Sequence, residues 1–152
     1  MLVIDPETGT LTLAGGRIDR GTTRSAFRAS PVAQGCRWED MRTGWTQAVL
    51  STQAAGPRTF TVRVLFECEQ LDGYRLCAVD PRYGASWDEW SEEKERARSD
   101  AHDALLIDLL GPGARRQRPD GSELTYAFPW GDVWSAYDAR SGGSEIGVRF
   151  LR

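Results

Sequence analysis

Hydrophobic residues alternate with mostly polar residues most regularly from Phe60 to Cys68, where every second side chain is apolar. This two-residue period is typical of a β-strand with one buried face. Asp72 and Gly73 follow soon after and form a dipeptide that favours a two-residue hairpin turn. A turn there places Cys77 opposite Cys68, on the face that the alternation marks as buried. The sequence therefore predicts a β-hairpin that turns at Asp72 and Gly73.

Weaker patterns predict strands in other parts of the chain. In residues 1–20, two short hydrophobic runs flank the turn sequence DPETG, which indicates a hairpin. One strand is expected within residues 45–51, followed by a turn at AAGP. Residues 112–122 are expected to form a loop. The remainder is expected to form a strand, a bend at 129–131 and a hairpin around DARSGG.

Two helices are predicted from their end signals. Thr22 or Thr23 can cap a short helix, which Pro31 should end. Ser91 is placed to cap a long helix whose hydrophobic residues gather in its C-terminal half. Gly111, followed by a proline, should end that helix.

These elements predict the order ββ-α-βββ-α-βββ. Strands joined by short turns pair antiparallel, and helices bury their hydrophobic sides against a sheet. We therefore expect a single α+β domain spanning residues 1–152. It should have a mainly antiparallel sheet, with one long and one short helix packed on one face.

Composition narrows the classes of function. The net charge is −3 at pH 7 and the pI is about 5.2, so the chain lacks the basic character typical of nucleic-acid binding. No leader sequence and no hydrophobic run of membrane-spanning length is recognised. We expect a cytoplasmic protein that binds neither nucleic acid nor membrane directly and that carries no cofactor.

Three cysteines and one histidine limit the metal and redox chemistry of the chain. With one histidine and no CxxC spacing, a metal site is not expected. If Cys68 faces Cys77, a reduced pair packed as small hydrophobic side chains is favoured, with a redox switch as the alternative. His102 stands near Asp100 and Asp103, but no oxyanion hole is evident. A half-exposed helical histidine is therefore expected, not a catalytic one.

Glycines and arginines do not indicate a phosphate site. The pieces AGGR, GPG and SGGS lack the spacing of phosphate-binding loops and are interpreted as turns. Arg115, Arg116 and Arg118 cluster in the predicted loop. A solvated loop is favoured over a phosphate contact in so acidic a chain.

The stretch SWDEWSEEKE, residues 86–95, carries two tryptophans and five carboxylates against a single lysine. Capping by Ser91, with Glu92 and Glu93 in the first turn, explains part of this composition. It does not explain Trp87 or the surplus of acid. A glycosidase-like carboxylate pair is not favoured, because side chains so close in sequence are expected to be solvated.

A protein-binding surface accounts better for this stretch. Tryptophan supplies contact area at interfaces, and carboxylates steer a basic partner during association. The residues expected to face the partner are Trp87, Asp88, Glu89, Glu92, Glu93 and Glu95.

The sequence WSEEKERARSDAHDALLIDLLG, followed by YAFPWGDVWSAYDARSGGSEIGVRF, resembles short bacterial α+β proteins of the toxin-immunity type. The resemblance covers the C-terminal part of the chain and carries over no binding residue. It implies a non-enzymatic protein that binds a cognate toxin and occludes its active site. The acidic composition fits a basic toxin domain as the protein partner.

Two other functions stay open. A homodimer is predicted if the tryptophan surface closes between two copies of the chain. A small-molecule-binding or enzymatic domain is predicted if a deep pocket holds two or more of the following residues of the C-terminal strands: Tyr126, Trp130, Asp132, Trp134 and Tyr137.

Overall fold

The computed structural model describes residues 1–118 and 121–152, and most of its strands join one large antiparallel sheet. The spatial order of the strands is β4-β5-β7-β8-β12-β11-β10-β9, and β6 pairs with β7 on the same side as β5. The strands are β4 Arg37–Arg42, β5 Trp45–Val49, β6 Gln53–Ala55, β7 Arg58–Glu67, β8 Gln70–Val79, β9 Ala114–Arg118, β10 Gly121–Phe128, β11 Gly131–Asp138 and β12 Gly143–Phe150.

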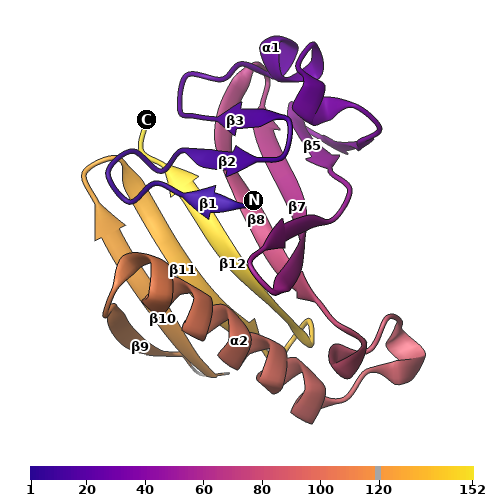
Figure 1. Cartoon of the computed structure of the whole chain (residues 1–152), viewed down its shortest axis with the longest axis vertical. Coiled ribbons are helices and arrows are strands. Elements are labelled where there is room, and N and C mark those ends of the chain that lie inside the picture. The colour runs from indigo at the N-terminus through magenta and orange to yellow at the C-terminus, as the bar shows by residue number, and fades with distance from the viewer. Residues whose placement is uncertain (119–120) are drawn as a thin grey trace.

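A small second sheet and two helices cover one face of the large sheet (Figure 1). The long helix α2, Glu92–Leu110, lies against β11, β12 and β8. The short helix α1, Arg24–Arg28, packs Phe27 on Phe66 of β7, with ring centroids 5.5 Å apart. The predicted α+β class, with one long and one short helix on one face, is confirmed. The small sheet consists of β1 Val3–Ile4, β2 Leu11–Leu13 and β3 Gly16–Ile18.

Side chains from these layers enclose one hydrophobic core. On β7, Phe60, Val62, Val64 and Phe66 are fully buried, which confirms the predicted alternation. Burying each such side chain contributes roughly 1.5–3 kcal/mol. No helix or sheet of the described residues packs on the opposite face of the large sheet. That face is therefore left to polar and aromatic side chains.

The hairpin that joins β7 to β8 turns at Cys68 and Glu69, so the predicted turn at Asp72 and Gly73 is wrong. Cys68 takes a φ of 52° to make the turn. Gly73 lies within β8, where an added Cβ would come within 1.9 Å of the Val148 carbonyl oxygen on β12. The glycine is required by this close approach of two strands, not by a turn.

The position of the turn also separates two cysteines. Cys77 lies opposite Thr61 of β7, and Cys68 is exposed at the turn. The predicted pairing of Cys68 with Cys77 is therefore wrong. The alternative of a redox switch between these two cysteines is wrong for the same reason. Burial raises the pKa of the Cys77 thiol, which disfavours its reactive thiolate form.

Two regions contain more strand than the sequence predicts. Residues 36–58, for which one strand is expected, hold β4, β5 and β6. β4 and β9 are edge strands, and no side chain of residues 37–42 or 114–117 is buried, so these strands show no clear hydrophobic alternation. The predicted loop with Arg115, Arg116 and Arg118 is β9, and Arg115 pairs with Asp103 of α2 at 2.7 Å. The expected loop also includes residues 119–120, which lie outside the described residues.

The predicted helix ends are confirmed. Thr23 caps α1, and its hydroxyl accepts from the backbone N–H of Ala26 at 3.1 Å. Ser91 caps α2 and accepts from the backbone N–H of Lys94 at 3.2 Å. Gly111 ends α2 with a φ of 79°, a conformation in which glycine is favoured.

His102 lies on the buried side of α2, so the expectation of a half-exposed histidine is wrong. Its Nε2 accepts a hydrogen bond from the backbone N–H of Ala78 in β8 at 2.9 Å. Burial, helped by the positive charge of Arg98, lowers the pKa of His102 to about 3. The imidazole is therefore neutral near pH 7 and links α2 to the sheet.

This buried imidazole predicts a loss of stability in mild acid. The unfolded chain takes up the proton near pH 6.5, whereas the folded chain takes it up only near pH 3. Between these values the unfolded state binds more protons, so the free energy of unfolding falls as the pH falls. From pH 7 to pH 5, urea unfolding should show a loss of about 2 kcal/mol.

The variant His102→Gln should remove most of this pH dependence. Its side-chain carbonyl can still accept from Ala78, but it does not titrate. The sequence has one histidine, so no other imidazole contributes in this range. If the free energy of unfolding falls equally between pH 7 and pH 5 in the variant and the parent, His102 is not the source of the pH dependence.

Candidate functional site

Residues 80–91 leave the end of β8 and project from a corner of the molecule before α2 begins (Figure 1). Two short 3₁₀ helices, Pro81–Tyr83 and Trp87–Glu89, organise this projecting segment. The side chain of Glu89 accepts from the backbone N–H of Ala85 at 2.7 Å and braces the second of them. The segment is therefore held in shape by its own hydrogen bonds.

The two tryptophans of the segment differ in how they are held. Trp90 donates its indole N–H to the Gly142 carbonyl oxygen at 2.7 Å, and its ring lies against that glycine. Trp87 lies beside it, with ring centroids 6.3 Å apart and an angle of 42° between the rings. Trp87 is 74% exposed and Trp90 39%. Trp90 thus anchors the segment, and Trp87 is presented to solvent.

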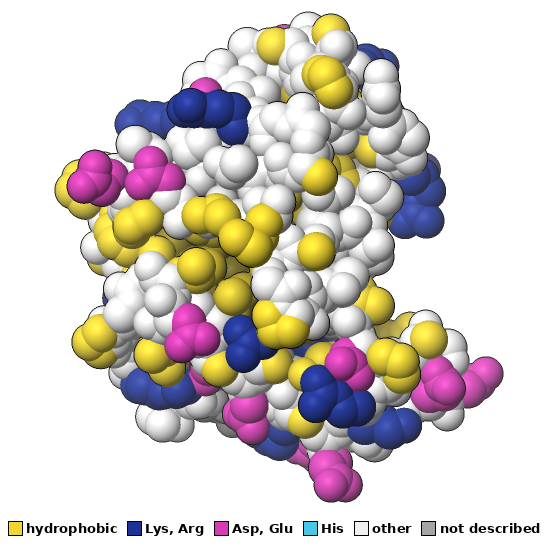
Figure 2. Space-filling model, viewed as in Figure 1, with side chains coloured by type: hydrophobic (Ala, Val, Ile, Leu, Met, Phe, Trp, Pro, Cys, Tyr) yellow, Lys and Arg dark blue, Asp and Glu magenta, His cyan; other side chains and the backbone are white. Residues whose placement is uncertain are grey.

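Carboxylates lie beside the exposed indoles. Figure 2 shows acidic and hydrophobic side chains together at the corner where this segment projects. Asp88 and Glu93 are exposed, and their carboxylates form no hydrogen bond or ion pair with the described residues. Glu92 pairs with Arg96 at 2.8 Å. Of the residues expected to face a partner, the structure brings five together on this exposed corner, namely Trp87, Asp88, Glu89, Glu92 and Glu93.

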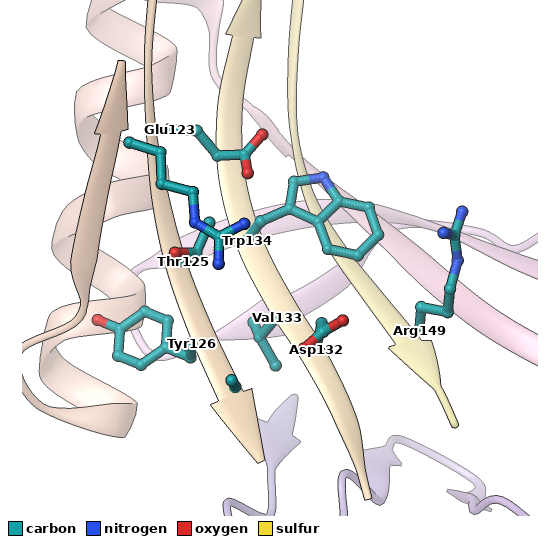
Figure 3. Close-up of a pocket in the computed structure, with 9 residues that line it drawn as sticks. Glu123, Thr125, Tyr126, Asp132, Val133, Trp134 and Arg149 are labelled. Atoms are coloured by element: carbon teal, nitrogen blue, oxygen red, sulfur yellow. The ribbon is translucent and has the colours of Figure 1, made fainter. Parts of the chain in front are cut away.

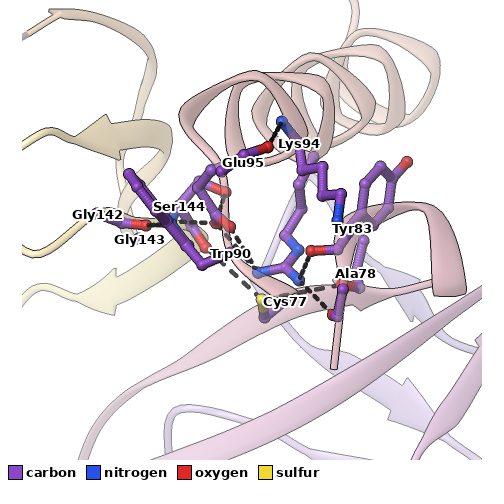
Figure 4. Close-up of polar contacts among 12 residues, drawn as sticks. Cys77, Ala78, Tyr83, Trp90, Lys94, Glu95, Gly142, Gly143 and Ser144 are labelled. Carbon is purple, nitrogen blue, oxygen red and sulfur yellow. Dashed lines mark hydrogen bonds and ion pairs between the residues drawn. The ribbon is translucent and has the colours of Figure 1, made fainter. Parts of the chain in front are cut away.

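Glu95 does not belong to this surface, and its expected exposure to a partner is wrong. It is 2% exposed. One carboxylate oxygen accepts from the backbone N–H and the hydroxyl of Ser144, at 2.9 and 2.8 Å (Figure 4). The guanidinium of Arg98 donates to both carboxylate oxygens at 3.1 and 3.0 Å. A carboxylate this deeply buried requires such partners, so its role is structural.

A cleft of about 340 Å³ opens between the projecting segment, α2 and the turn before β12. Trp87 and Trp90 supply its aromatic lining. The buried carboxylate and guanidinium, together with Ser144, supply its polar lining (Figure 4). The cleft therefore adjoins the exposed acidic corner and offers it a recess for one partner side chain.

Sequence reasoning missed the buried polar face at the start of α2. Glu95, Arg98, His102 and Leu105 follow one another at intervals of three and four residues, which places them on one side of a helix. The spacing is a usable signal. Because the first three of these side chains are polar, a search for hydrophobic residues finds only the C-terminal half of the helix.

A second hollow lies on the open face of the large sheet (Figure 3). Trp134 of β11 lies across Gly147 of β12, where an added Cβ would come within 2.1 Å of the indole ring. The guanidinium groups of Arg75 and Arg149 lie 4.8 and 5.8 Å from the ring centroid. Trp134 borders a groove of about 320 Å³ that also has Asp132 in its lining.

This groove is bordered by three of the five residues named for a small-molecule pocket. Tyr126, Asp132 and Trp134 border it. However, the Tyr126 hydroxyl donates to the Gly111 carbonyl oxygen at the end of α2, so the ring turns to the covered face. Trp130 and Tyr137 are buried on that covered face as well. Small-molecule binding at the groove stays a prediction.

Two further searches concern the described residues alone. None of their His, Cys, Asp and Glu side chains form a group of three or more that could hold a metal ion. None of the helices in this part of the chain is both long and apolar enough to cross a membrane.

Comparison with known proteins identifies a fold likeness. No protein-family model matches the sequence, and no curated protein matches it. The fold is similar to that of a chain in the solved structure of Rhs1-CT in complex with cognate immunity protein RhsI1, with a TM-score of 0.55. The sequence identity is 15%, and the match covers 99% of this chain and 87% of the other. At this identity the likeness shows a shared fold.

The buried carboxylate predicts a large effect of a conservative substitution. Glu95→Gln keeps the size of the side chain but leaves the partly buried guanidinium of Arg98 without its counter-charge. We expect the free energy of unfolding, measured in urea, to fall by about 2–4 kcal/mol. Glu93→Gln, on the exposed side of the same turn, should change it by less than about 0.5 kcal/mol. Similar small effects of both substitutions would contradict the structural role of Glu95.

Proposed function

We propose that this protein is a non-enzymatic immunity protein that binds a cognate toxin domain and neutralises it. The observation that carries the proposal is Trp87, 74% exposed, beside unpaired carboxylates on a segment braced by hydrogen bonds. A large aromatic side chain held in water is typical of a surface that a partner covers. The fold likeness to a chain of an immunity-protein complex supports the same class.

The proposed binding surface consists of Trp87, Asp88, Glu89, Glu92 and Glu93. Its carboxylates attract a basic toxin domain and raise the rate of encounter. The indole of Trp87 then becomes buried and slows dissociation. Because the segment projects, it enters the active site of the toxin and excludes the substrate. We expect this neutralisation to take place in the cytoplasm.

Co-expression tests the proposed function directly. Growth of a host that expresses the toxin domain encoded beside this chain's gene should be restored when this protein is co-expressed. The two purified proteins should form a complex of defined mass in light scattering. Toxicity that persists despite abundant folded protein would overturn the proposal. A dimer of this chain that dissociates on Trp87→Ala would instead favour the self-association alternative.

Binding kinetics test which surface is used. The double substitution Glu92→Lys and Glu93→Lys should lower the association rate constant about ten-fold or more at low ionic strength and change dissociation less. Added salt should reduce the difference in association rate between the double variant and the parent protein, because salt screens exposed charges.

A matched control separates the surface from net charge. Glu7→Lys with Asp108→Lys changes two exposed carboxylates far from the corner by the same total charge. This control should associate nearly as fast as the parent protein. Equal slowing in both double variants would show that the corner has no special part in binding.

A further inference from the structure

Arginine side chains lie over aromatic rings at several places in this protein. A guanidinium stacked on a ring is attracted to the negative face of the π system, and the contact is stronger when water is excluded. Among the described residues, four aromatic rings have such a partner. The distances from guanidinium carbon to ring centroid are 4.3 Å for Arg28 on Trp38, 4.8 Å for Arg75 on Trp134, 4.6 Å for Arg96 on Tyr137 and 5.4 Å for Arg98 on Tyr83.

Trp87 and Trp90 are the exposed tryptophans of the described residues, and no guanidinium of those residues lies over either ring. Both rings line the cleft of about 340 Å³, which has ample room for one long side chain. Trp90 is fixed by its hydrogen bond to Gly142. Trp87 has no such bond among the described residues, so its ring can adjust to an inserted group.

The charges around the cleft favour a cation. Asp88 lies between the tryptophans in sequence and Glu93 follows them; both are exposed, lie outside the lining of the cleft itself, and have carboxylates without a partner among the described residues. The ammonium of Lys94 donates to the Glu89 carbonyl oxygen at 2.7 Å and does not enter a pair with either carboxylate. Inside the cleft, the positive charge of Arg98 is already neutralised by its buried carboxylate partner at 3.0 Å. An approaching cation therefore meets aromatic faces in the cleft and unpaired carboxylates on the residues adjacent in sequence.

We infer that the cleft between Trp87 and Trp90 binds an arginine side chain of the partner. Its guanidinium stacks on the indoles and donates to the carboxylates at the rim. Arginine fits better than lysine, because the guanidinium is planar, weakly hydrated and able to stack on a ring while its edge donates to a carboxylate. The inference rests on the proposed function only in placing this arginine on the toxin.

Titration of this protein with N-acetylarginine amide tests the inference without the toxin. The indole N–H signals of Trp87 and Trp90 in NMR spectra, assigned from single Trp→Phe variants, should shift together and saturate. The dissociation constant should be on the order of 1–10 mM for a single side chain. N-acetyllysine amide should bind several-fold more weakly, and N-acetylcitrulline amide, which has the same shape without the charge, should bind weakest.

Matched variants localise the effect. Trp87→Ala changes an exposed residue, so the fold should persist, and it should abolish the shift at Trp90. Asp88→Asn with Glu93→Gln should weaken binding several-fold. Trp45→Ala, on the large sheet, should leave it unchanged. If the citrulline amide binds as tightly as the arginine amide, the inference is overturned in favour of an apolar anchor. Equal shifts of all six indole signals would also overturn it.

The two proposals fail in distinguishable ways. If arginine binds but the toxin is not neutralised, the cleft is a guanidinium site and the proposed function is wrong. If the toxin is neutralised but arginine does not bind, the immunity function stands and the inference is wrong.

Discussion

The buried carboxylate of Glu95 is the contact on which the geometry of the exposed corner depends. It joins the first turn of α2 to the start of β12 through two hydrogen bonds from Ser144. It also holds Arg98, whose guanidinium reaches the carbonyl oxygens of Tyr83 and Gly84 at 3.4 and 3.5 Å. Helix, sheet and projecting segment thus meet at one ion pair. Because a buried charge is costly without all of its partners, these groups hold one another in a single arrangement.

The two halves of α2 are attached to the sheet by different forces. Leu105 and Leu106 bury hydrophobic surface, which is favourable but tolerates small rotations. The N-terminal half uses the Glu95 network, and the middle of the helix uses the hydrogen bond from Ala78 to His102; both are directional. Directional bonds fix the position of a helix start more narrowly than packing does. The helix start in turn determines where the tryptophans just before α2 lie. The polar half of the helix therefore positions the candidate site and also stabilises the fold.

The success of sequence reasoning here depends on whether each signal is local. The alternation of β7 and the hydroxyl caps at Thr23 and Ser91 arise from neighbouring residues, and the structure confirms them. Asp72 and Gly73 also carry a local signal, for a turn, but the glycine is needed by β12, which approaches within 1.9 Å of where a Cβ would stand. That strand lies far along the chain. Turn propensity contains no information about such a contact. Because the predicted turn was misplaced, the predicted pairing of Cys68 with Cys77 was wrong as well.

The same distinction between local and distant contacts applies to the candidate site. The capping of α2 and the charge of its first turn can be predicted from the sequence, whereas the burial of Glu95 is decided by Ser144, which is 49 residues away. Trp87 and Trp90 have the same side chain and stand three residues apart, yet among the described residues only the indole N–H of Trp90 has an acceptor, the Gly142 carbonyl oxygen. The Gly142 carbonyl oxygen therefore accepts from one of the two indoles at this corner, and the other indole stays exposed. The exposure of Trp87 has no explanation within the capped helix or the braced segment. Under the proposed function, a contact with the partner explains it, because there that indole can lose its water.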